Sequence, residues 1–246
     1  MHGAARRVIA TPSLACMNSA FVPESSLEAH LDQVQARWDA LRASNDLQAR
    51  SERVQAEMDP DAFDRMMTAA SRAKSSGQRV LWLHRAADVV AGAVSRAKAS
   101  ACKKGCDHCC HIPVSLSRSE ATHLAAVSGK QMAAAPAHAV RVSSELEQLR
   151  SGIAPGGAES QRWRHHIGQA CPFLSHGECS VWATRPLACR YYYSMDMDDL
   201  LCNLLPDQQG VEVPQLNVLA FTAMSWGILG LNQDVADIRD WFPSDA

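Results

Sequence analysis

The chain has 246 residues, of which 47% are hydrophobic and 20% are charged, a composition typical of a soluble globular protein with a sizeable core. The formal net charge of −2 excludes long-range attraction to nucleic acid or to an anionic membrane surface. The most apolar run, Leu216 to Leu231, is interrupted by polar residues and falls short of the roughly 20 residues that a membrane-spanning helix needs. We therefore expect a cytoplasmic protein with no nucleic-acid or membrane partner, acting on a protein or small-molecule partner that the sequence does not identify.

Residues 1–24 are expected to be disordered or to precede the true start of the protein. Arg6 and Arg7 precede an apolar stretch of about 8 residues, which lies at the lower limit for the hydrophobic part of a signal peptide. Met17 is an alternative initiator. Cys16 would then lie upstream of the protein, and we assign it no role.

Residues 25–99 are predicted to form an N-terminal helical region. Ser25 and Glu28 have the spacing of a capping box. The apolar residues that follow recur at steps of four and three, which places them on one face of a helix: Leu27, Leu31, Val34, Trp38 and Leu41.

Two further helices are predicted in this region. Asp59 and Pro60 are a start signal, with Asp as the N-cap and Pro at the first helical position. The apolar stripe of that helix is Phe63, Met66, Met67 and Ala70, and Gly77 is expected to break it. The third helix is marked by Val80, Leu83, Ala87, Val90 and Val94, and it should end near Lys98.

After residue 100 the pattern predicts a cysteine-cluster domain over 100–205 and C-terminal helices over 206–246 that pack on the core. Ser117 and Glu120 form a capping box for a helix that ends near Val127, and another helix is expected over 137–149. Residues 155–157, Pro-Gly-Gly, predict a loop. An apolar helix within 216–231 and an amphipathic piece over 235–241 complete the chain. The predicted fold is a mainly α helical bundle in which two cysteine-rich loops form a metal centre.

Nine cysteines are the most informative feature of the composition. Thiols of a cytosolic protein stay reduced, so metal or redox chemistry is favoured over a disulfide scaffold. Apart from Cys16 they form two groups of four, separated by about sixty residues. The predicted metal ligands are Cys102, Cys106, Cys109 and Cys110 in the first group and Cys171, Cys179, Cys189 and Cys202 in the second.

The short spacings favour a metal because a loop of two or three residues can turn and direct two sulfurs at one ion. Gly105, directly before Cys106, suits a turn with positive φ. In an extended segment the neighbours Cys109 and Cys110 would point to opposite sides. We therefore expect them to serve two metals, to bridge two metals, or to divide into one ligand and one thiol outside the coordination shell.

Four thiolates around one divalent ion leave a net charge of about −2 that requires compensation. Arg185 and Arg190 flank Cys189 and are predicted to supply it. Pro186 stands where a helix can begin, which would direct backbone N–H groups at a nearby sulfur.

The cysteine motifs resemble those of the CxxCxxCC family, also called YkgJ-like, whose members are described as zinc- or iron-chelating. The matching pieces are Cys102-Lys103-Lys104-Gly105-Cys106-Asp107-His108-Cys109-Cys110, Cys171-Pro172-Phe173-Leu174, Cys179-Ser180-Val181-Trp182 and Arg185-Pro186-Leu187-Ala188-Cys189-Arg190. The resemblance covers roughly residues 101–204. Two departures are the three residues between Cys102 and Cys106, and Trp182 where the family has Tyr. The resemblance implies chelation rather than a reaction.

The histidines near these motifs have alternative interpretations. His108 and His111 adjoin cysteine ligands and could replace one of them, although a place outside the coordination shell is favoured. His165 and His166 could be a metal pair or a proton shuttle, and an exposed pair is the preferred interpretation. His176 is expected at the surface of a turn.

The sequence therefore favours a binding or structural protein whose eight cysteines chelate zinc or iron, either as two zinc ions or as an iron–sulfur cluster with a further site. The alternative is an iron–sulfur or metal-dependent redox or group-transfer enzyme, since flagellin lysine methylases carry a loosely similar Cys-Pro-Phe-Leu region. Against an enzyme, the chain has no dinucleotide fingerprint, P-loop, nucleophile elbow or HExxH-type motif. A third interpretation is a redox sensor or metal-delivery protein.

Overall fold

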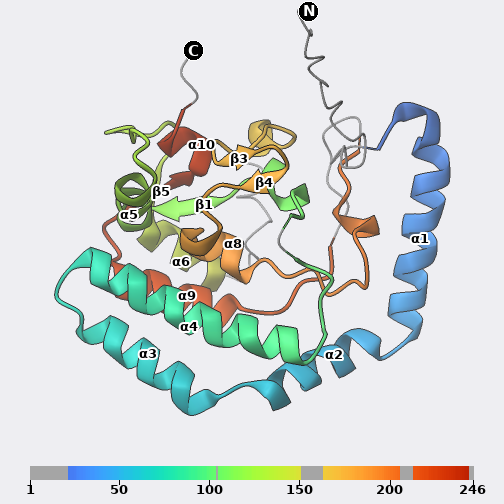
Figure 1. Ribbon diagram of the computed structural model, residues 1–246, viewed down its shortest axis with the longest axis horizontal. Helices are drawn as coiled ribbons and strands as arrows, with labels where there is room; N and C mark the ends of the chain where they lie inside the picture. Colours follow the sequence, from blue (N-terminus) through green and yellow to red (C-terminus); the bar gives the residue numbers. More distant parts are fainter. Residues whose placement is uncertain (1–21, 104, 151–162, 206–212, 244–246) are drawn as a thin grey trace, which may run out of the picture.

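The computed structural model describes residues 22–103, 105–150, 163–205 and 213–243. The predictions for the signal-like segment, for Cys16 and for the loop at 155–157 lie outside these residues. The described chain is mainly helical, as predicted, with α1 to α4 (residues 27–96) along one side and a small antiparallel sheet, next to α5 (Arg118–Ser128), α6 (Val142–Arg150) and α10 (Ile238–Trp241), on the other (Figure 1). None of the described helices combines the length and apolarity needed to span a membrane.

Four helices precede the cysteine motifs. They are α1 (Leu27–Ala43), α2 (Asp46–Glu57), α3 (Pro60–Arg72) and α4 (Ser76–Arg96), and the 3-10 turn η1 (Glu24–Ser26) comes before them. The start signal of α3 is confirmed: the Asp59 side chain accepts a hydrogen bond of 2.8 Å from the Ala62 N–H, and Pro60 is the first helical residue. The capping box at Ser25 is wrong, because Ser25 lies inside the 3-10 turn. The N-cap of α1 is Ser26, whose side chain does not accept a hydrogen bond from the first turn of the helix.

Two boundaries in this region differ from the prediction. α3 already ends at Arg72, and Gly77 lies in the first turn of α4 instead of breaking a helix. The reason is local, since the Ser75 hydroxyl accepts from the Gln78 N–H at 3.3 Å and begins α4 around the glycine. α2 was not predicted, because its sequence is predominantly polar and it buries only Arg50 and Val54.

α4 is the central helix of the molecule, with α3 packed along it and α9 (Leu219–Leu229) close by (Figure 1). Its buried face joins residues from both sides of the cysteine motifs into one core. The members of this core include Val54, Ala70, Val80, Leu83, Ala87, Val90, Leu187, Tyr191, Met195, Phe221 and Leu229. Each large apolar side chain buried there contributes about 1.5–3 kcal/mol. The first hundred residues and the cysteine-bearing part therefore share their apolar interior.

A three-stranded antiparallel sheet was not predicted. It has the order β1-β5-β2, from β1 (Ser115–Ser117), β5 (Asp234–Asp237) and β2 (Val140–Arg141). Because β2 pairs with β5, the helix expected over 137–149 begins only at the start of α6 (Val142–Arg150). The amphipathic piece at 235–241 likewise divides into β5 and the short helix α10 (Ile238–Trp241).

The elements around the first cysteine group follow their local signals. α5 (Arg118–Ser128) has the predicted capping box: the Ser117 hydroxyl accepts from the Glu120 N–H, and the Glu120 carboxylate accepts from the Ser117 N–H. Gly129 ends α5 in the left-handed conformation. The apolar helix expected within 216–231 is α9.

Candidate metal centre

The first cysteine segment turns twice within ten residues. Gly105 has φ +87°, as its position before Cys106 predicted, and the Cys106 N–H donates to the Lys103 carbonyl at 3.2 Å. The chain then enters the 3-10 turn η2 (His108–His111), which the Cys110 N–H helps to close by donating to the Asp107 carbonyl at 2.8 Å.

The compact turn changes the expectation for the adjacent pair Cys109 and Cys110. That expectation assumed an extended segment, in which the two side chains diverge. In the 3-10 turn both residues line the same cavity, and their thiols are hydrogen-bonded to each other. The assumption that the Cys109 and Cys110 side chains point to opposite sides of an extended segment is therefore wrong. One 3-10 turn can direct both sulfurs at one centre.

A β-hairpin positions the next two cysteines. β3 (Leu174–Ser175) pairs with β4 (Glu178–Cys179), and the two turn residues between them, His176 and Gly177, both have positive φ, at 51° and 75°. A two-residue turn of this kind matches the twist of a hairpin. The hairpin folds Cys179 back beside Cys171, which precedes β3, and it leaves His176 exposed, as predicted.

The seventh cysteine, Cys189, lies on α8 (Leu187–Tyr191), which begins directly after Pro186, as predicted. The N–H of Leu187 does not point at sulfur, however, because it donates to Oε1 of Glu120 at 3.0 Å. The buried Glu120 carboxylate therefore joins the start of α5 to the start of α8.

The two cysteine segments are held together by backbone contacts and by one buried arginine. The Cys171 N–H donates to the Cys110 carbonyl at 2.8 Å. The Arg239 guanidinium, on α10, donates to the carbonyl groups of Cys110 (2.9 Å), Gln169 (2.6 Å) and Ile112 (3.2 Å). Sequence reasoning missed Arg239, because it is distant from every cysteine motif and no local pattern distinguishes it.

These segments enclose one cavity of about 220 Å³. Seven of the eight predicted ligands line it, namely Cys102, Cys106, Cys109, Cys110, Cys171, Cys179 and Cys189. Its other walls are largely apolar and include Val114, Phe173 and Ile238. Only Cys102 of the seven is an exposed residue.

Cys202 is not among the lining residues, but it lies near the cavity. It is carried by the 3-10 turn η5 (Leu200–Cys202), and its thiol interacts electrostatically with Cys102, Cys106 and Cys109. The buried Leu201 of this turn packs against Val34 and Leu41 of α1. An N-terminal helix thus supports the last cysteine of the second group.

Burial governs the protonation of the thiols. It raises the pKa of Cys106 and Cys171 to about 11 and that of Cys202 to about 12, and it raises the pKa of Cys189 well above its ordinary value. The hydrogen bond that the Cys109 thiol donates to Cys110, together with burial, raises the pKa of Cys109 well above its ordinary value. Without a bound cation, burial therefore favours the neutral form of these five thiols.

Of the two arginines expected to compensate thiolate charge, one is placed for that purpose. Arg185 lines the cavity above the Trp182 ring at 3.9 Å, and its charge opposes the effect of burial on the pKa of Cys179 and Cys189. Arg190 faces the other way: it is paired with Asp88 of α4 and donates to backbone carbonyls, including that of Arg185 at 2.9 Å.

The histidines beside the first cysteine group do not line the cavity. His108 is buried, with Nε2 at 3.3 Å from the Asp199 carboxylate, and His111 Nδ1 is 3.2 Å from the Asp107 carbonyl. The prediction of an exposed pair at 165–166 is half correct, since His165 is exposed and His166 is buried.

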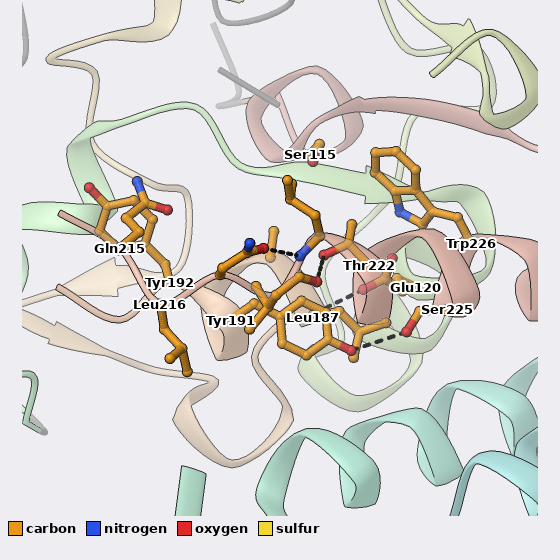
Figure 2. Close-up of a pocket in the computed structure, with 14 residues that line it drawn as sticks. Ser115, Glu120, Leu187, Tyr191, Tyr192, Gln215, Leu216, Thr222, Ser225 and Trp226 are labelled. Atoms are coloured by element: carbon orange, nitrogen blue, oxygen red, sulfur yellow. Dashed lines mark hydrogen bonds between the residues drawn. The ribbon is translucent and has the colours of Figure 1, made fainter. Parts of the chain in front are cut away.

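A second cavity, of about 290 Å³, lies on the other side of α8 (Figure 2). Leu187 and Tyr191 of α8 line it together with residues of α9, and the Tyr191 hydroxyl is 3.2 Å from the Ser225 hydroxyl. Tyr192 lines both cavities. No sequence motif indicated this pocket, because its walls come mainly from α8, from α9 and from residues 215–218, which are distant in the chain.

Comparison with known proteins agrees with the cysteine geometry. Residues 101–212, a little under half of the chain, match the model of the CxxCxxCC family, described as a "putative zinc- or iron-chelating domain". The family that the motifs resemble is thus confirmed for this segment. No curated protein and no solved structure gives a significant match.

Proposed function

We propose that the protein binds zinc or iron through its eight clustered cysteines, and that the bound metal has a structural or binding role. The observation that carries this proposal is the convergence of seven cysteines, from two segments about sixty residues apart, on one cavity. Thiolates are soft ligands that select zinc, copper(I) or iron–sulfur clusters over magnesium or calcium.

The apolar walls support a resident cation. Ionisation of a buried thiol costs free energy in an apolar cavity. A cation that replaces the protons of several thiols offsets this cost, because it neutralises the negative charge of the thiolates. Among the described residues, Lys103 and Arg185 are the cations that line the cavity, and two positive charges offset only part of the charge of several thiolates. When bound, zinc would cross-link the segments, and iron could in addition exchange electrons.

The thiols fall into two adjoining groups according to which of them interact electrostatically, and this grouping favours two adjoining metal centres. Cys102, Cys106 and Cys202 form one group, and Cys171, Cys179 and Cys189 form the other. Cys109 interacts with members of both groups, and Cys110 is next to it. We assign the Cys109–Cys110 turn to the junction, so that each group of three is completed to four thiolates.

The test is elemental analysis with an absorption spectrum on full-length protein purified without oxygen. Two zinc ions per chain in colourless protein would support two four-thiolate centres. Iron with acid-labile sulfide in brown protein would support an iron–sulfur cluster. Protein that takes up neither metal on reconstitution contradicts the proposal.

Serine variants identify the ligands. Cys106→Ser and Cys189→Ser each remove one cysteine, from the first and the second group, and both should lose metal and stability together. The unchanged protein is the control, and in protein that begins at Met1, Cys16→Ser is a second control because Cys16 is the one cysteine outside both groups. If both variants keep the metal content of the unchanged protein, the two cysteines are not ligands.

A metal-dependent redox or group-transfer enzyme is the second candidate, and the cavity beyond α8 is the observation that favours it. That cavity is lined mostly by apolar side chains, as small-molecule sites commonly are, and Tyr192 separates it from the thiols. Bound iron would favour this alternative, whereas zinc with four thiolates per ion would favour the structural role.

A further inference from the structure

A group of three side chains remote from the cysteine cavity also has metal-ligand chemistry. His138, His165 and Asp240 come from three separate segments, the loop before β2, the 3-10 turn η3 (Arg164–His166) and α10. One ligand atom of each lies within 4.8 Å of the others. None of the three lines the cysteine cavity.

Asp240 is the least exposed member of the group. Its side chain is 7% exposed, and its Oδ1 is 3.1 Å from Nε2 of His166. Its Oδ2 is buried and has no hydrogen-bond partner among the described residues. A buried carboxylate oxygen without a donor is unfavourable unless a cation is bound to it.

His166 holds this carboxylate in place. Its Nδ1 is 3.0 Å from Oε1 of Gln169, and its Nε2 faces Asp240. Both ring nitrogens are therefore engaged, and His166 serves to orient Asp240. Partners of this kind, one step outside the ligands, are common at metal sites.

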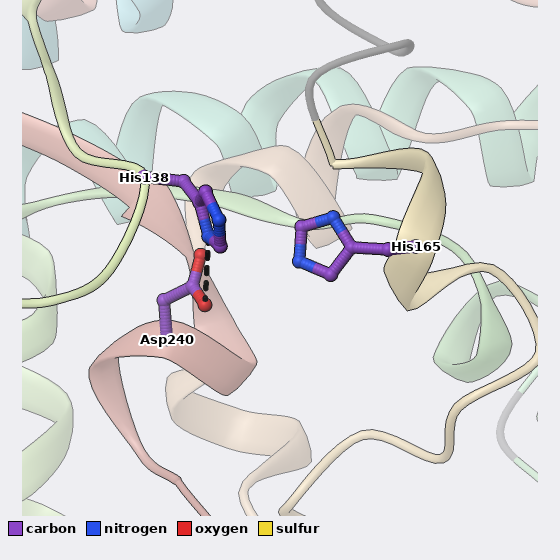
Figure 3. A group of neighbouring side chains, drawn as sticks. All are labelled: His138, His165 and Asp240. Carbon is purple, nitrogen blue, oxygen red and sulfur yellow. Dashed lines mark ion pairs between the residues drawn. The ribbon is translucent and has the colours of Figure 1, made fainter.

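His138 and His165 supply the two imidazoles. Figure 3 shows the His138 ring beside the Asp240 carboxylate, with Nδ1 3.7 Å from Oδ1, and the His165 ring directed toward this pair. The two rings lie 4.7 Å apart. Both residues are exposed, so their side chains can close to the spacing of about 3.3 Å between ligands of a tetrahedral zinc ion.

We propose that His138, His165 and Asp240 form a further metal site, separate from the cysteine centres, which binds a divalent ion of zinc type in addition to any metal that the cysteines hold. Two imidazoles and one carboxylate suit zinc and its neighbours among the transition metals better than magnesium or calcium, which prefer oxygen alone. Three protein ligands leave a fourth position for water. This proposal does not depend on metal binding by the cysteines, because the two sets share no residue.

The site would join three parts of the chain at α10. Asp240 directly follows Arg239, the residue whose guanidinium holds the carbonyls of Cys110 and Gln169. A metal ion at Asp240 therefore stabilises the helix that anchors both cysteine segments.

The test compares zinc binding by the full-length protein with that of His138→Ala and His165→Ala. Both changes are at exposed residues, so folding should be retained. We expect each variant to lose one zinc ion per chain, or at least about tenfold in affinity for that ion, in zinc titrations followed by elemental analysis. The matched control is His176→Ala, an exposed histidine in the β3–β4 turn, which should bind as the unchanged protein does.

Cobalt distinguishes the two kinds of site, because cobalt bound to thiolate has a strong charge-transfer absorption that cobalt bound to imidazole and carboxylate lacks. The proposal requires that absorption to be unchanged in both variants. Titration curves of His138→Ala and His165→Ala that superimpose on that of His176→Ala would overturn it. A loss of the thiolate absorption in these variants would overturn it as well, since the change would then have disturbed the cysteine centre.

Discussion

At the scale of single residues, burial determines the protonation state of His84. It lies on the buried face of α4, where its ring meets that of His123 edge to face, with the ring centres 5.7 Å apart. Burial, followed by the charges of Arg190, His123 and Arg185, lowers the pKa of His84 to about 3. The folded protein thus holds this imidazole neutral.

The first prediction concerns acid stability. Below pH 6.5 the unfolded chain binds a proton at His84 that the folded chain does not bind until about pH 3, so stability falls as the pH is lowered through this window. One such group contributes a slope of up to about 1.4 kcal/mol per pH unit. His84→Leu should flatten that slope, measured by urea unfolding of metal-free protein between pH 6.5 and pH 4. If the free energy of unfolding depends on pH with the same slope in the variant and in the unchanged protein, the prediction is contradicted.

At the scale of elements, the contact between α5 and α8 determines where Cys189 lies. Glu120 is buried at the first turn of α5, and its two carboxylate oxygens have separate partners. Oε2 accepts from the N–H and the hydroxyl of Ser117, and Oε1 accepts from the N–H of Leu187. Glu120, which belongs to the capping box that predicted the start of α5, therefore also positions α8, the helix that carries Cys189.

The second prediction follows from these two roles. Glu120→Ala leaves two buried N–H groups without an acceptor, which should lower the free energy of unfolding by about 2–4 kcal/mol and weaken metal binding through the displacement of α8. Ser117→Ala removes the cap and the hydroxyl bond to Oε2 but leaves the bond from Leu187 to Oε1, so it should cost about 1 kcal/mol with metal affinity unchanged. Urea unfolding and a competition titration with a chelator measure the two effects. Equal metal affinity in both variants would show that Glu120 does not position Cys189.

The shared core is the feature that matters at the scale of the whole molecule. α4 packs against α5, α8 and α9, so its apolar face is buried by residues that follow the first cysteine group. Arg37 of α1 is in addition paired with Asp196 and Asp198, and Arg190 is paired with Asp88 of α4. The family match begins at residue 101, but the interior that supports the cysteines extends across that position.

The third prediction is that residues 101–246 do not fold alone. Without α1 to α4 this fragment exposes Leu187, Tyr191 and Phe221, and it loses the partner of Arg190. We expect the fragment to melt without a cooperative transition, followed by near-ultraviolet circular dichroism with and without added zinc. The full-length protein is the control. A cooperative transition of the fragment, with the metal content of the full chain, would show that the cysteine region is an independent domain.

The fourth prediction concerns removal of the metal. A ligand that binds only the folded state, at a free concentration 100 times its dissociation constant, stabilises it by about 2.7 kcal/mol. For a chain of this size, removal of metal with a chelator should therefore lower the melting temperature by about 5–10 °C. Calorimetry with and without chelator measures the shift. An unchanged melting temperature would argue against metal that bridges the two cysteine segments.

Some features could be predicted because their causes are local. The N-cap at Asp59 and the capping box at Ser117 depend on atoms no more than three residues apart, and both are confirmed. The positive φ at Gly105 is local in the same sense. Cysteine spacing also indicated which side chains should gather, since close spacing in sequence requires closeness in space.

Other features required the tertiary structure because their partners are distant in the chain. The strands have two to four residues each, too short for a periodic pattern, and β5 finds its partners about 95 and 120 residues earlier. The turn that brings Cys109 and Cys110 to one cavity depends on a 3-10 geometry that an alternation rule misses.

The amino-acid sequence by itself therefore determined the helical character of the chain, the caps at Asp59 and Ser117 and the presence of two cysteine groups, since each depends on neighbours within a few residues. Only the tertiary structure decided that seven cysteines share a cavity, that Arg239 clamps both segments, and that His138, His165 and Asp240 meet at α10. The physical reason is that these arrangements depend on burial and on contacts between distant segments, which no local pattern records.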